Sequence, residues 1–504
     1  MMVTVLSCAL SGLDPSLIQV ETDLSNGLPK CMVVGLPDST INEAKDRVRS
    51  AIKNSGFDFP TRRLTINLAP ADLPKEGSGF DLPMAIGILA VSGQIPVESL
   101  KDYLFIGELG LDGSVRPVSG LLAMAAMAAE RGPNRVIVPA ANMKEALIFD
   151  NLHVWPVKSI VDAVAVLHGL VAPSDEKVSW IADDHWPHDF AEVKGQPHAK
   201  RSLEIAAAGN HNVLMIGPPG SGKTMLAQRF PGILPPYTFE ESVEVSKIQS
   251  VAGLLKNDQG LITQRPYRTP HSNVSYAGMV GGGSPIKPGE LSLAHHGVLF
   301  MDELPQFHLD VLDSLRQPLE DKSISVVRLS GSVRYPAEFL FVGAMNPCPC
   351  GYFGDLRRTC MCRPSERINY MKRISGPLLD RIDLHVEISR LSHERFSSRE
   401  ISEPSTVIRE RVMRARQKQE KRFGSKTNSQ MSSSEMDRFC ELSTESEQLL
   451  KRAYDKLYFS ARGHSKILKI ARSIADLAES ADIEVIHLAE ALQYRVLDRN
   501  LYQE

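Results

Sequence analysis

The stretch Gly217-Pro218-Pro219-Gly220-Ser221-Gly222-Lys223-Thr224 has the pattern G-x-x-x-x-G-K-T. An apolar run at 212–216 precedes it and predicts a buried strand, while residues 225–228 can open a helix. A strand, a glycine-rich loop and a helix in this order predict a phosphate-binding loop, because loop N–H groups and a helix N-terminus attract phosphate oxygens. We expect Lys223 to reach the β- and γ-phosphates of ATP and the Thr224 hydroxyl to ligate Mg²⁺. The alternative is a chance glycine-rich turn.

An acidic pair follows a second apolar run. Residues 298–303 read V-L-F-M-D-E and predict a strand that ends in Asp302 and Glu303. We expect Asp302 to hold Mg²⁺ through water and Glu303 to polarise the attacking water. Neighbouring residues on a strand point in opposite directions, so the two carboxylates can take different tasks. The alternative is a strand end that turns to solvent.

A third apolar run, at 339–345, ends at Asn346. If this strand lies between the other two, the Asn346 amide can hydrogen-bond the γ-phosphate or orient the attacking water. An asparagine that merely forms a turn is the alternative.

These motifs, followed by G-P-L-L-D-R-I-D at 376–383, resemble the AAA+ ATPases in their order. The resemblance is strongest to the branch that holds magnesium-chelatase motor subunits and minichromosome-maintenance helicases. It implies that Arg381 reaches the ATP of a neighbouring subunit, where a guanidinium stabilises transition-state charge. Arg373 is a competing candidate, and a structural, salt-bridged arginine is the alternative. Arg462 matches the second sensor of the family, which contacts the γ-phosphate in the same or an adjacent subunit; a solvated helix arginine is the alternative.

Composition places the chain among ordinary globular proteins and excludes few functions. It has 504 residues, 43% hydrophobic and 23% charged, with a formal net charge of -3, so any DNA-binding surface must be local. No apolar run reaches membrane-spanning length, and the N-terminus lacks the basic region of a secretory signal. Four of the seven cysteines cluster, which suits a reducing cytoplasm with one metal site.

We divide the chain into four parts by its composition and patterning. Residues 1–170 mix β-type runs, such as 64–68 and 135–138, with alanine-rich helical stretches, such as 121–129, which indicates an α/β domain. Residues 171–190 are acidic and loop-like, a linker candidate, and 191–392 hold the nucleotide chemistry. Residues 393–504 are strongly helical, apart from a polar stretch at 424–435 that predicts a flexible loop.

Two β-type runs within 323–335 flank Leu329-Ser330-Gly331-Ser332, which predicts a hairpin. In the helicase branch, a hairpin at this place projects into the hexamer pore and grips DNA with a basic residue. The resemblance assigns that role to Arg328, with Arg334 and Lys322 nearby. A glycine-rich stretch at 278–287 is a second candidate pore element. The alternative is an ordinary surface hairpin with solvated arginines.

Four cysteines give the pattern C-x-C, nine intervening residues, C-x-C: Cys348, Cys350, Cys360 and Cys362. Four thiolates can bind Zn²⁺ tetrahedrally and pin the loop after Asn346. The spacing is tighter than in the usual C-x-x-C knuckle, so plain reduced thiols and a redox pair remain as alternatives.

The N-terminal domain resembles the Lon protease domain at two segments. Residues 74–85 look like the serine-bearing segment, but the nucleophile position falls on Gly79; residues 113–124 look like the lysine-bearing segment, but that position falls on Met124. Ser78 is one residue out of register and lacks a lysine to activate it. We therefore expect a retained fold that is catalytically inactive.

Over essentially its whole length, the chain is similar to the ComM family, also called YifB-like or magnesium-chelatase-like. The resemblance implies a Lon-protease-like α/β domain, an AAA+ core with a parallel sheet, and a C-terminal helical domain. It also implies a homohexameric, ATP-driven DNA helicase that promotes branch migration in homologous recombination, as in natural transformation. A chelatase-type motor that remodels a partner enzyme is the main alternative. An ATP-dependent protease and a non-motor DNA-binding scaffold are further ones.

Overall fold

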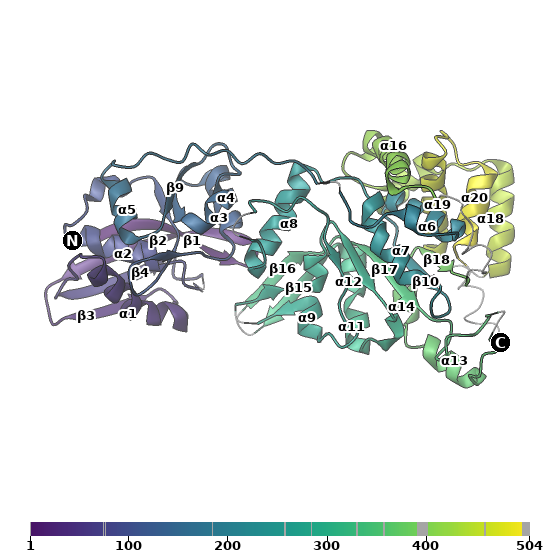
Figure 1. The fold of residues 1–504 in the computed structure, drawn as a ribbon, viewed down its shortest axis with the longest axis horizontal. Coiled ribbons are helices and arrows are strands. Elements are labelled where there is room, and N and C mark those ends of the chain that lie inside the picture. Colours follow the sequence, from purple (N-terminus) through teal and green to yellow (C-terminus); the bar gives the residue numbers. More distant parts are fainter. Residues whose placement is uncertain are drawn as a thin grey trace.

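The computed structural model describes residues 2–495 except 74, 76, 184, 257–258, 284, 329–330, 356–357, 391–401 and 458–459. The predicted turn at 329–330 and the predicted domain boundary at 392/393 therefore lie outside the described residues. The molecule is elongated, with the N-terminal unit at one end and the C-terminal helices at the other (Figure 1). An extended segment runs along the top of Figure 1 from the N-terminal unit to the central sheet.

The N-terminal unit is built on a seven-stranded mixed sheet with the order β3-β4-β2-β1-β5-β8-β9. Apolar residues on one face form a core with α1, α2 and α5, and those on the other pack against α3. The predicted strands at 64–68 and 135–138 and the predicted helix at 121–129 are confirmed. The main elements are β1 (Met2–Ser11), β2 (Asp14–Ser25), β3 (Lys30–Val34), α1 (Ser39–Asn54), β4 (Arg63–Ala69), α2 (Asp81–Val91), β5 (Tyr103–Phe105), β6 (Glu108–Leu109), β7 (Val115–Arg116), α3 (Leu121–Arg131), β8 (Arg135–Pro139), α4 (Met143–Ala146), β9 (His153–Val157) and α5 (Ile160–Leu167).

The central sheet has five strands in the order β11-β14-β17-β10-β18, and every pairing in it is parallel. Its three inner strands are short, apolar and buried on both faces, as parallel sheets covered on two sides require. They are β10 (Val213–Ile216), β11 (Tyr267–Arg268), β14 (Val298–Met301), β17 (Leu340–Met345) and β18 (Leu384–Glu387). Because the strands are parallel, the segments that follow β10, β14 and β17 all begin at one edge.

Side chains alternate between the two faces of this sheet. Val213 and Met215 join a core with α6, α7 and the C-terminal helices, while Leu214 and Ile216 join a core on the opposite face. The helices of this region are α6 (Pro197–Gly209), α7 (Lys223–Arg229), α8 (Phe239–Ala252), α9 (Tyr276–Val280), α10 (Glu290–Leu293), α11 (Leu309–Ser314), α12 (Arg316–Asp321), α13 (Pro364–Met371) and α14 (Gly376–Leu379).

Two hairpins extend from the central unit. The predicted hairpin is confirmed as β15 (Ser323–Arg328) and β16 (Gly331–Pro336), paired antiparallel from Ser323 opposite Pro336 to Arg328 opposite Gly331. The glycine-rich stretch forms a second, shorter pair, β12 (Gly281–Gly282) with β13 (Lys287–Pro288).

The C-terminal region is helical and packs on α6 and the sheet. Its helices are α16 (Ser405–Phe423), α17 (Ser433–Phe439), α18 (Thr444–Leu457), α19 (Ala461–Leu477) and α20 (Val485–Gln493). The prediction of a flexible loop at 424–435 was wrong. Asn428 within it is fully buried, and its amide donates to Ser473 and Asp476 at 3.0 and 2.9 Å. Composition alone missed this because the polar residues bond to buried partners on α19 rather than to water.

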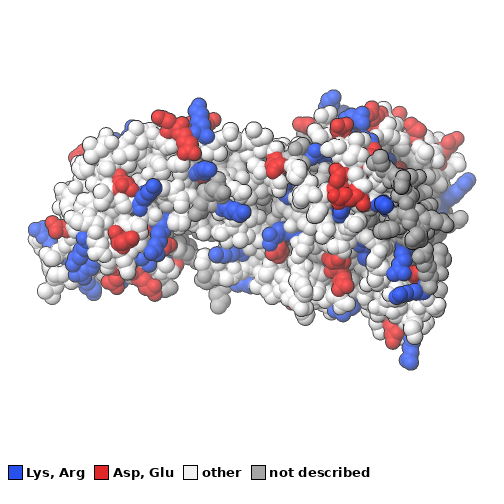
Figure 2. All heavy atoms as spheres, viewed as in Figure 1, with Lys and Arg blue, Asp and Glu red and all other residues white. Residues whose placement is uncertain are grey.

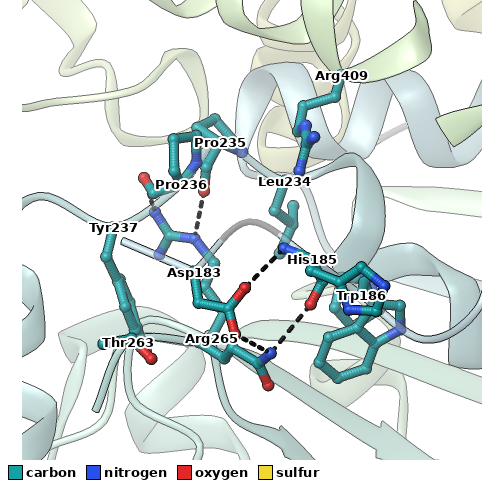
Figure 3. Close-up of a pocket in the computed structure, with 12 residues that line it drawn as sticks. Asp183, His185, Trp186, Leu234, Pro235, Pro236, Tyr237, Thr263, Arg265 and Arg409 are labelled. Atoms are coloured by element: carbon teal, nitrogen blue, oxygen red, sulfur yellow. Dashed lines mark hydrogen bonds between the residues drawn. The ribbon is translucent and has the colours of Figure 1, made fainter. Parts of the chain in front are cut away.

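The segment between the N-terminal unit and the sheet is docked rather than loose, although no helix or strand forms among the described residues of 171–189. Its Trp186 indole donates to the Gln228 carbonyl at 2.7 Å, and Asp183 accepts from Gln264 at 2.7 Å. Trp186 and Asp183 both line the small cavity of Figure 3. The cavity drawn there has a volume of about 20 Å³, which is room for about one water molecule. It is a packing gap and not a substrate site.

Acidic and basic side chains are interspersed over the face shown in Figure 2. Within the described parts of the chain, no helix combines the length and the hydrophobicity needed to span a bilayer.

Candidate active site

The phosphate loop connects β10 to α7 at the carboxyl edge of the central sheet. Gly220 and Gly222 have positive φ angles of 74° and 94°, although a Cβ at either would meet nothing within 4 Å. These two positions therefore need glycine for backbone conformation, whereas Gly217 needs it for space, since a Cβ there would collide with the Ile388 carbonyl. The resulting curl precedes a helix N-terminus, the arrangement that binds phosphate.

Lys223 is the first residue of α7 and is only 8% exposed. Its ammonium donates to the carbonyls of Gly217 and Pro218 at 2.6 and 3.1 Å and to Oδ1 of Asn346 at 3.1 Å. Burial lowers the pKa of Lys223, and the nearby Asp302 and Glu303 carboxylates oppose that shift. The cation is thus held inside the loop, next to the predicted third motif.

Thr224 and Asp302 meet across two adjoining segments. The Thr224 hydroxyl donates to Oδ2 of Asp302 at 2.7 Å. A hydroxyl and a carboxylate are hard oxygen donors of the kind that Mg²⁺ takes in nucleotide sites, so this pair fits that ion. This hydrogen bond connects the G-x-x-x-x-G-K-T loop to the acidic motif.

The acidic pair lies beyond the end of its strand, so strand alternation does not separate the two carboxylates as expected. Strand β14 ends at Met301, before the pair, and Glu303 lies in the left-handed region with φ 51° and ψ 47°. Its N–H donates to Oδ1 of Asp302 at 2.9 Å. A turn, and not a strand, therefore separates the carboxylates, and a non-glycine residue held in this conformation is typical of functional sites.

Strand β17 lies between β10 and β14, so the condition set for Asn346 is met. Asn346 follows the last residue of β17 and reaches Lys223, as described above. The hydroxyl of Tyr370, whose pKa burial raises to about 12, is hydrogen-bonded to the backbone of Asn346. Asn346 is therefore fixed at the carboxyl edge beside the loop.

Arg381 and Arg462 come together at the opposite edge of the sheet. Both guanidiniums bond to the Glu320 carboxylate, Arg462 at 3.1 Å, and Arg381 also donates to the Pro377 carbonyl at 2.8 Å. The amide of Asn212, directly before β10, donates to the Arg381 carbonyl at 3.3 Å, which places Arg381 at the amino edge. The length of β10, roughly 13 Å at about 3.3 Å per residue, separates this edge from the phosphate loop.

A cavity of about 550 Å³ opens at this amino edge. Its walls include acidic groups such as Glu320 and Asp383, but cations outnumber acids among the side chains that line it. The cationic ones are Lys322, Arg381, Arg462, Lys466 and Lys469. The competing Arg373 lies elsewhere, with its guanidinium 3.5 Å from the Phe307 carbonyl.

The three candidate DNA contacts are not equivalent. Arg328 is exposed at the end of β15, and its guanidinium lies 3.5 Å from the Gly281 carbonyl of the glycine-rich hairpin. Arg334 is exposed but bonds to the Ser323 hydroxyl at 2.8 and 3.0 Å near the base of its hairpin. Lys322 lines the cavity at the amino edge and does not lie near the hairpin's tip. Arg328 alone of the three connects the two hairpins.

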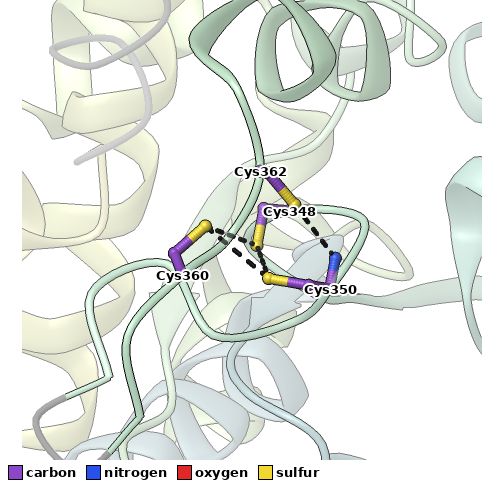
Figure 4. A group of neighbouring side chains, drawn as sticks. All are labelled: Cys348, Cys350, Cys360 and Cys362. Carbon is purple, nitrogen blue, oxygen red and sulfur yellow. Dashed lines mark hydrogen bonds between the residues drawn. The ribbon is translucent and has the colours of Figure 1, made fainter.

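The four cysteines gather in one loop between β17 and α13, with their thiols turned toward one another (Figure 4). The Sγ atom of Cys348 lies 3.3 Å from that of Cys350 and 3.6 Å from that of Cys360. Thiolates on a tetrahedral Zn²⁺ with bonds of about 2.3 Å lie about 3.8 Å apart, so the set fits this ion. Backbone N–H groups of Cys350 and Phe353 donate to Cys362 and Cys348, both at 3.3 Å, as around metal-bound sulfurs.

The Lon-like positions carry no hydrolytic pair. Met124 is 7% exposed and packs in the core, and the nearest atom to a Cβ on Gly79 would belong to Val118. The Ser78 hydroxyl donates to the Glu108 carboxylate. A carboxylate is too weak a base to activate a serine hydroxyl as a lysine amine does.

Sequence reasoning missed several residues that complete these arrangements. Glu320, Tyr370 and Arg390 belong to no motif, and their partners lie far away in the chain. Gly351 offered a signal, because it directly follows the C-x-C pair at a point where the chain must turn.

Comparisons with known proteins agree with this architecture. Three family models match: "Subunit ChlI of Mg-chelatase" over residues 20–142, "Magnesium chelatase, subunit ChlI" over 189–396, and its C-terminal part over 402–495. The chain is 43% identical over 506 residues to Competence protein ComM of Haemophilus influenzae, covering 99% of this chain and 98% of that protein. It is 43% identical over 495 residues to YifB of Escherichia coli K12, covering 98% and 97%. A Lon protease of Azorhizobium caulinodans is 29% identical over 176 residues, covering 32% of this chain and 20% of that protein.

Proposed function

The chain belongs to the ComM and YifB family of magnesium-chelatase-like AAA+ proteins, and from that premise we propose that it is an ATP-driven DNA motor. The family implies ATPase chemistry with ATP and Mg²⁺. The finer proposal is a homohexameric helicase or translocase, acting in the cytoplasm, that promotes branch migration in homologous recombination. The name of the Haemophilus influenzae relative connects that protein to competence, and we extend this to a role in natural transformation.

In the proposed hydrolysis, each residue at the carboxyl edge has its own task. Lys223 neutralises the β- and γ-phosphates, and Thr224 and Asp302 hold Mg²⁺, which supplies Lewis-acid polarisation of the phosphate when bound. Glu303 accepts a proton from the attacking water, and Asn346 orients that water or the γ-phosphate. The hydrogen bond between Lys223 and Asn346 supports these roles. The hydrogen bond between Thr224 and Asp302 supports them as well.

One observation carries the proposal of a multi-subunit motor: the two arginines lie at the edge of the sheet opposite the phosphate loop. Arg381 and Arg462 share Glu320 there and open onto the cationic cavity. Neither guanidinium can serve the phosphate loop of its own chain across the length of β10. We propose that both act in trans on the ATP of a neighbouring subunit, so that each active site needs two chains.

The hairpin β15–β16 supports DNA as the partner. Arg328 is exposed beside the glycine-rich β12–β13 hairpin, so the two elements present one cationic surface. We propose that this surface faces the central channel and contacts phosphates without reading bases, with Arg334 and Lys322 in lesser roles. The four cysteines are proposed to hold one structural Zn²⁺.

A strand-displacement assay tests the proposal. Purified protein with ATP and Mg²⁺ should migrate a branched DNA junction and should hydrolyse ATP faster when DNA is added. A protein that forms hexamers but ignores DNA at low salt would contradict the DNA motor.

The matches to chelatase subunit models favour a second candidate, a motor that remodels a partner enzyme. That candidate expects ATP hydrolysis without stimulation by DNA and without movement of a junction. The same assay therefore separates the two functions.

A further inference from the structure

The segment that carries the four cysteines, residues 348–362, is called the four-cysteine loop. It contacts the phosphate loop, residues 217–224, directly. Gly351, which follows Cys350, is buried with a positive φ of 83°, and a Cβ there would lie 2.6 Å from Cδ and 2.8 Å from Cγ of Pro219. The same Cβ would lie 3.7 Å from Cγ of Asn346. The backbone at Gly351 is thus wedged between two nucleotide-site segments, and a proline ring has little freedom to yield.

A second contact joins the same two loops from another side. The Arg390 guanidinium donates to the Pro219 carbonyl at 3.2 Å and lies 3.9 Å from Oδ2 of Asp355, in the four-cysteine loop. The Asp355 side chain is only 3% exposed. The four-cysteine loop therefore contacts the Pro219 ring directly through Gly351, while Arg390, which follows β18, bridges Asp355 of that loop to the Pro219 carbonyl.

The remainder of the phosphate loop is anchored independently. The Gln196 amide donates to the Ser221 carbonyl at 3.2 Å, and Gly217 is pressed against Ile388. Between these anchors, Gly220 has open space on its side-chain side. The contacts from Gly351 and Arg390 thus act on the middle of the loop, whose glycine-rich backbone would otherwise cost conformational entropy to order around phosphate.

We propose that the four-cysteine loop, with zinc bound, is a positioning element of the nucleotide site. It holds the Pro218–Gly220 part of the phosphate loop in its phosphate-binding form through Gly351 and Arg390. The inference rests on the proposed ATPase function but goes beyond it, because it makes nucleotide affinity depend on an ion that never contacts the nucleotide. Loss of zinc releases Gly351 and Asp355, the partner of Arg390, from their fixed positions. The phosphate loop then loses the contacts that hold its middle part in place.

A matched pair of glycine variants tests this positioning. Gly354 lies in the same loop with a φ of 79°, but a Cβ there meets nothing within 4 Å. Gly351→Ala and Gly354→Ala therefore impose similar backbone strain, yet only the first displaces Pro219. We expect Gly351→Ala to weaken binding of a fluorescent ATP analogue about tenfold and Gly354→Ala to leave it within about twofold, with zinc content unchanged in both. Equal affinities in the two variants would overturn the inference.

Arginine variants give a second arm that does not depend on how Gly351→Ala folds. Arg390→Gln should weaken binding of the analogue several-fold while zinc stays at one per chain. The control is Arg358→Gln, since Arg358 belongs to the same loop but donates to the Tyr352 hydroxyl at 2.7 Å. If Arg390→Gln binds the ATP analogue with wild-type affinity, Arg390 does not help to position the phosphate loop.

Zinc removal provides the third arm, measured by hydrogen exchange rather than by activity. Cys360→Ser should lose zinc, and the peptide spanning 217–224 should exchange faster while a peptide from β1–β2 does not change. Unchanged hydrogen exchange at 217–224 in zinc-free protein would refute the positioning role of the four-cysteine loop but not the proposed ATPase function. Wild-type protein that fails to bind the ATP analogue would instead refute the proposed function.

Discussion

The ammonium of Lys223 joins two segments that are 123 residues apart in the sequence, by donating to both the phosphate loop and Asn346. In the same way, the Thr224 hydroxyl joins the loop to Asp302. Because these side chains already bond to one another, the proposed nucleotide site is preorganised without ATP. Substitutions at single positions should therefore separate binding from turnover.

Lys223→Ala and Glu303→Gln should fail at different steps. Removing the buried ammonium deletes charge-assisted hydrogen bonds to phosphate, so ATP affinity should fall roughly 10- to 100-fold. Glu303→Gln keeps the shape but cannot accept a proton, so affinity should stay near wild type while turnover falls on the order of 100-fold or more. Titration with an ATP analogue and steady-state ATPase rates measure the two effects. Wild-type turnover in Glu303→Gln would contradict the assignment.

Arg381→Ala should bind ATP yet hydrolyse it on the order of a thousandfold more slowly, because the guanidinium stabilises charge only in the transition state. Mixing these subunits with Lys223→Ala subunits should restore part of the activity, at interfaces where both intact residues meet. Arg373→Ala is the control, since Arg373 lies apart from the cavity at the amino edge. No recovery on mixing, with mixed hexamers confirmed, would argue against action in trans.

At the scale of elements, a buried ion pair joins the C-terminal helical region to the central sheet. Lys466 on α19 lies 2.8 Å from Asp383, which directly precedes β18, and the two side chains are 16% and 12% exposed. Burial alone would raise the pKa of Asp383, but Lys466 and His211 outweigh it and hold that pKa well below its ordinary range. The stability that this carboxylate contributes is therefore present above its unfolded pKa of about 4 and is lost as the pH falls further.

Lys466→Met should lower the free energy of unfolding by about 3 kcal/mol at neutral pH, because it leaves Asp383 buried without its cation. Lys469→Met is the matched control on the same helix. Its ammonium donates to the neutral Ser429 carbonyl at 3.0 Å, so its loss should cost about 1 kcal/mol. Denaturant unfolding measures both values, and equal losses in the two variants would show that the ion pair has no special role.

The elements that sequence predicted best are those whose signal is local. An apolar run followed by a polar motif predicts each of the strands β10, β14 and β17. The turn residues between two β-type runs predict the hairpin β15–β16. The polar stretch at 424–435 was misread because Asn428 is satisfied by partners on α19, which no local pattern reveals. The same reason hid Glu320 and Arg390, whose roles exist only after the chain has folded.

At the scale of the whole molecule, the two edges of one parallel sheet carry the two sets of residues that the proposed hexamer would bring together. The phosphate loop lies at the carboxyl edge and the arginines at the amino edge. The N-terminal unit packs on this assembly through contacts that include a hydrogen bond from the Gly120 N–H to the Ser250 carbonyl of α8 at 3.0 Å. In another of them, Gly12 packs against Val333 of β16. The second contact joins the N-terminal β1–β2 turn to the same hairpin that presents Arg328.

The last prediction concerns that hairpin and the coupling of hydrolysis to movement. Arg328→Ala removes an exposed cation without touching the nucleotide site, so ATP hydrolysis in the absence of DNA should persist. Stimulation by DNA and migration of a junction should fall sharply. DNA affinity should drop alike for unrelated sequences, and the slope of log K against log salt should become shallower by about one, because a phosphate contact carries no base information.

Arg334→Ala on the same hairpin sets the scale of this effect. Its guanidinium is already committed to the Ser323 hydroxyl, so the loss of DNA binding should be smaller than in Arg328→Ala. If both variants weaken DNA binding equally, the hairpin acts as a general cationic surface and not through its tip. If neither variant changes the stimulation of ATP hydrolysis by DNA, and junction migration continues, the DNA-binding surface must lie elsewhere. The contact between Arg328 and the glycine-rich hairpin would then be structural only.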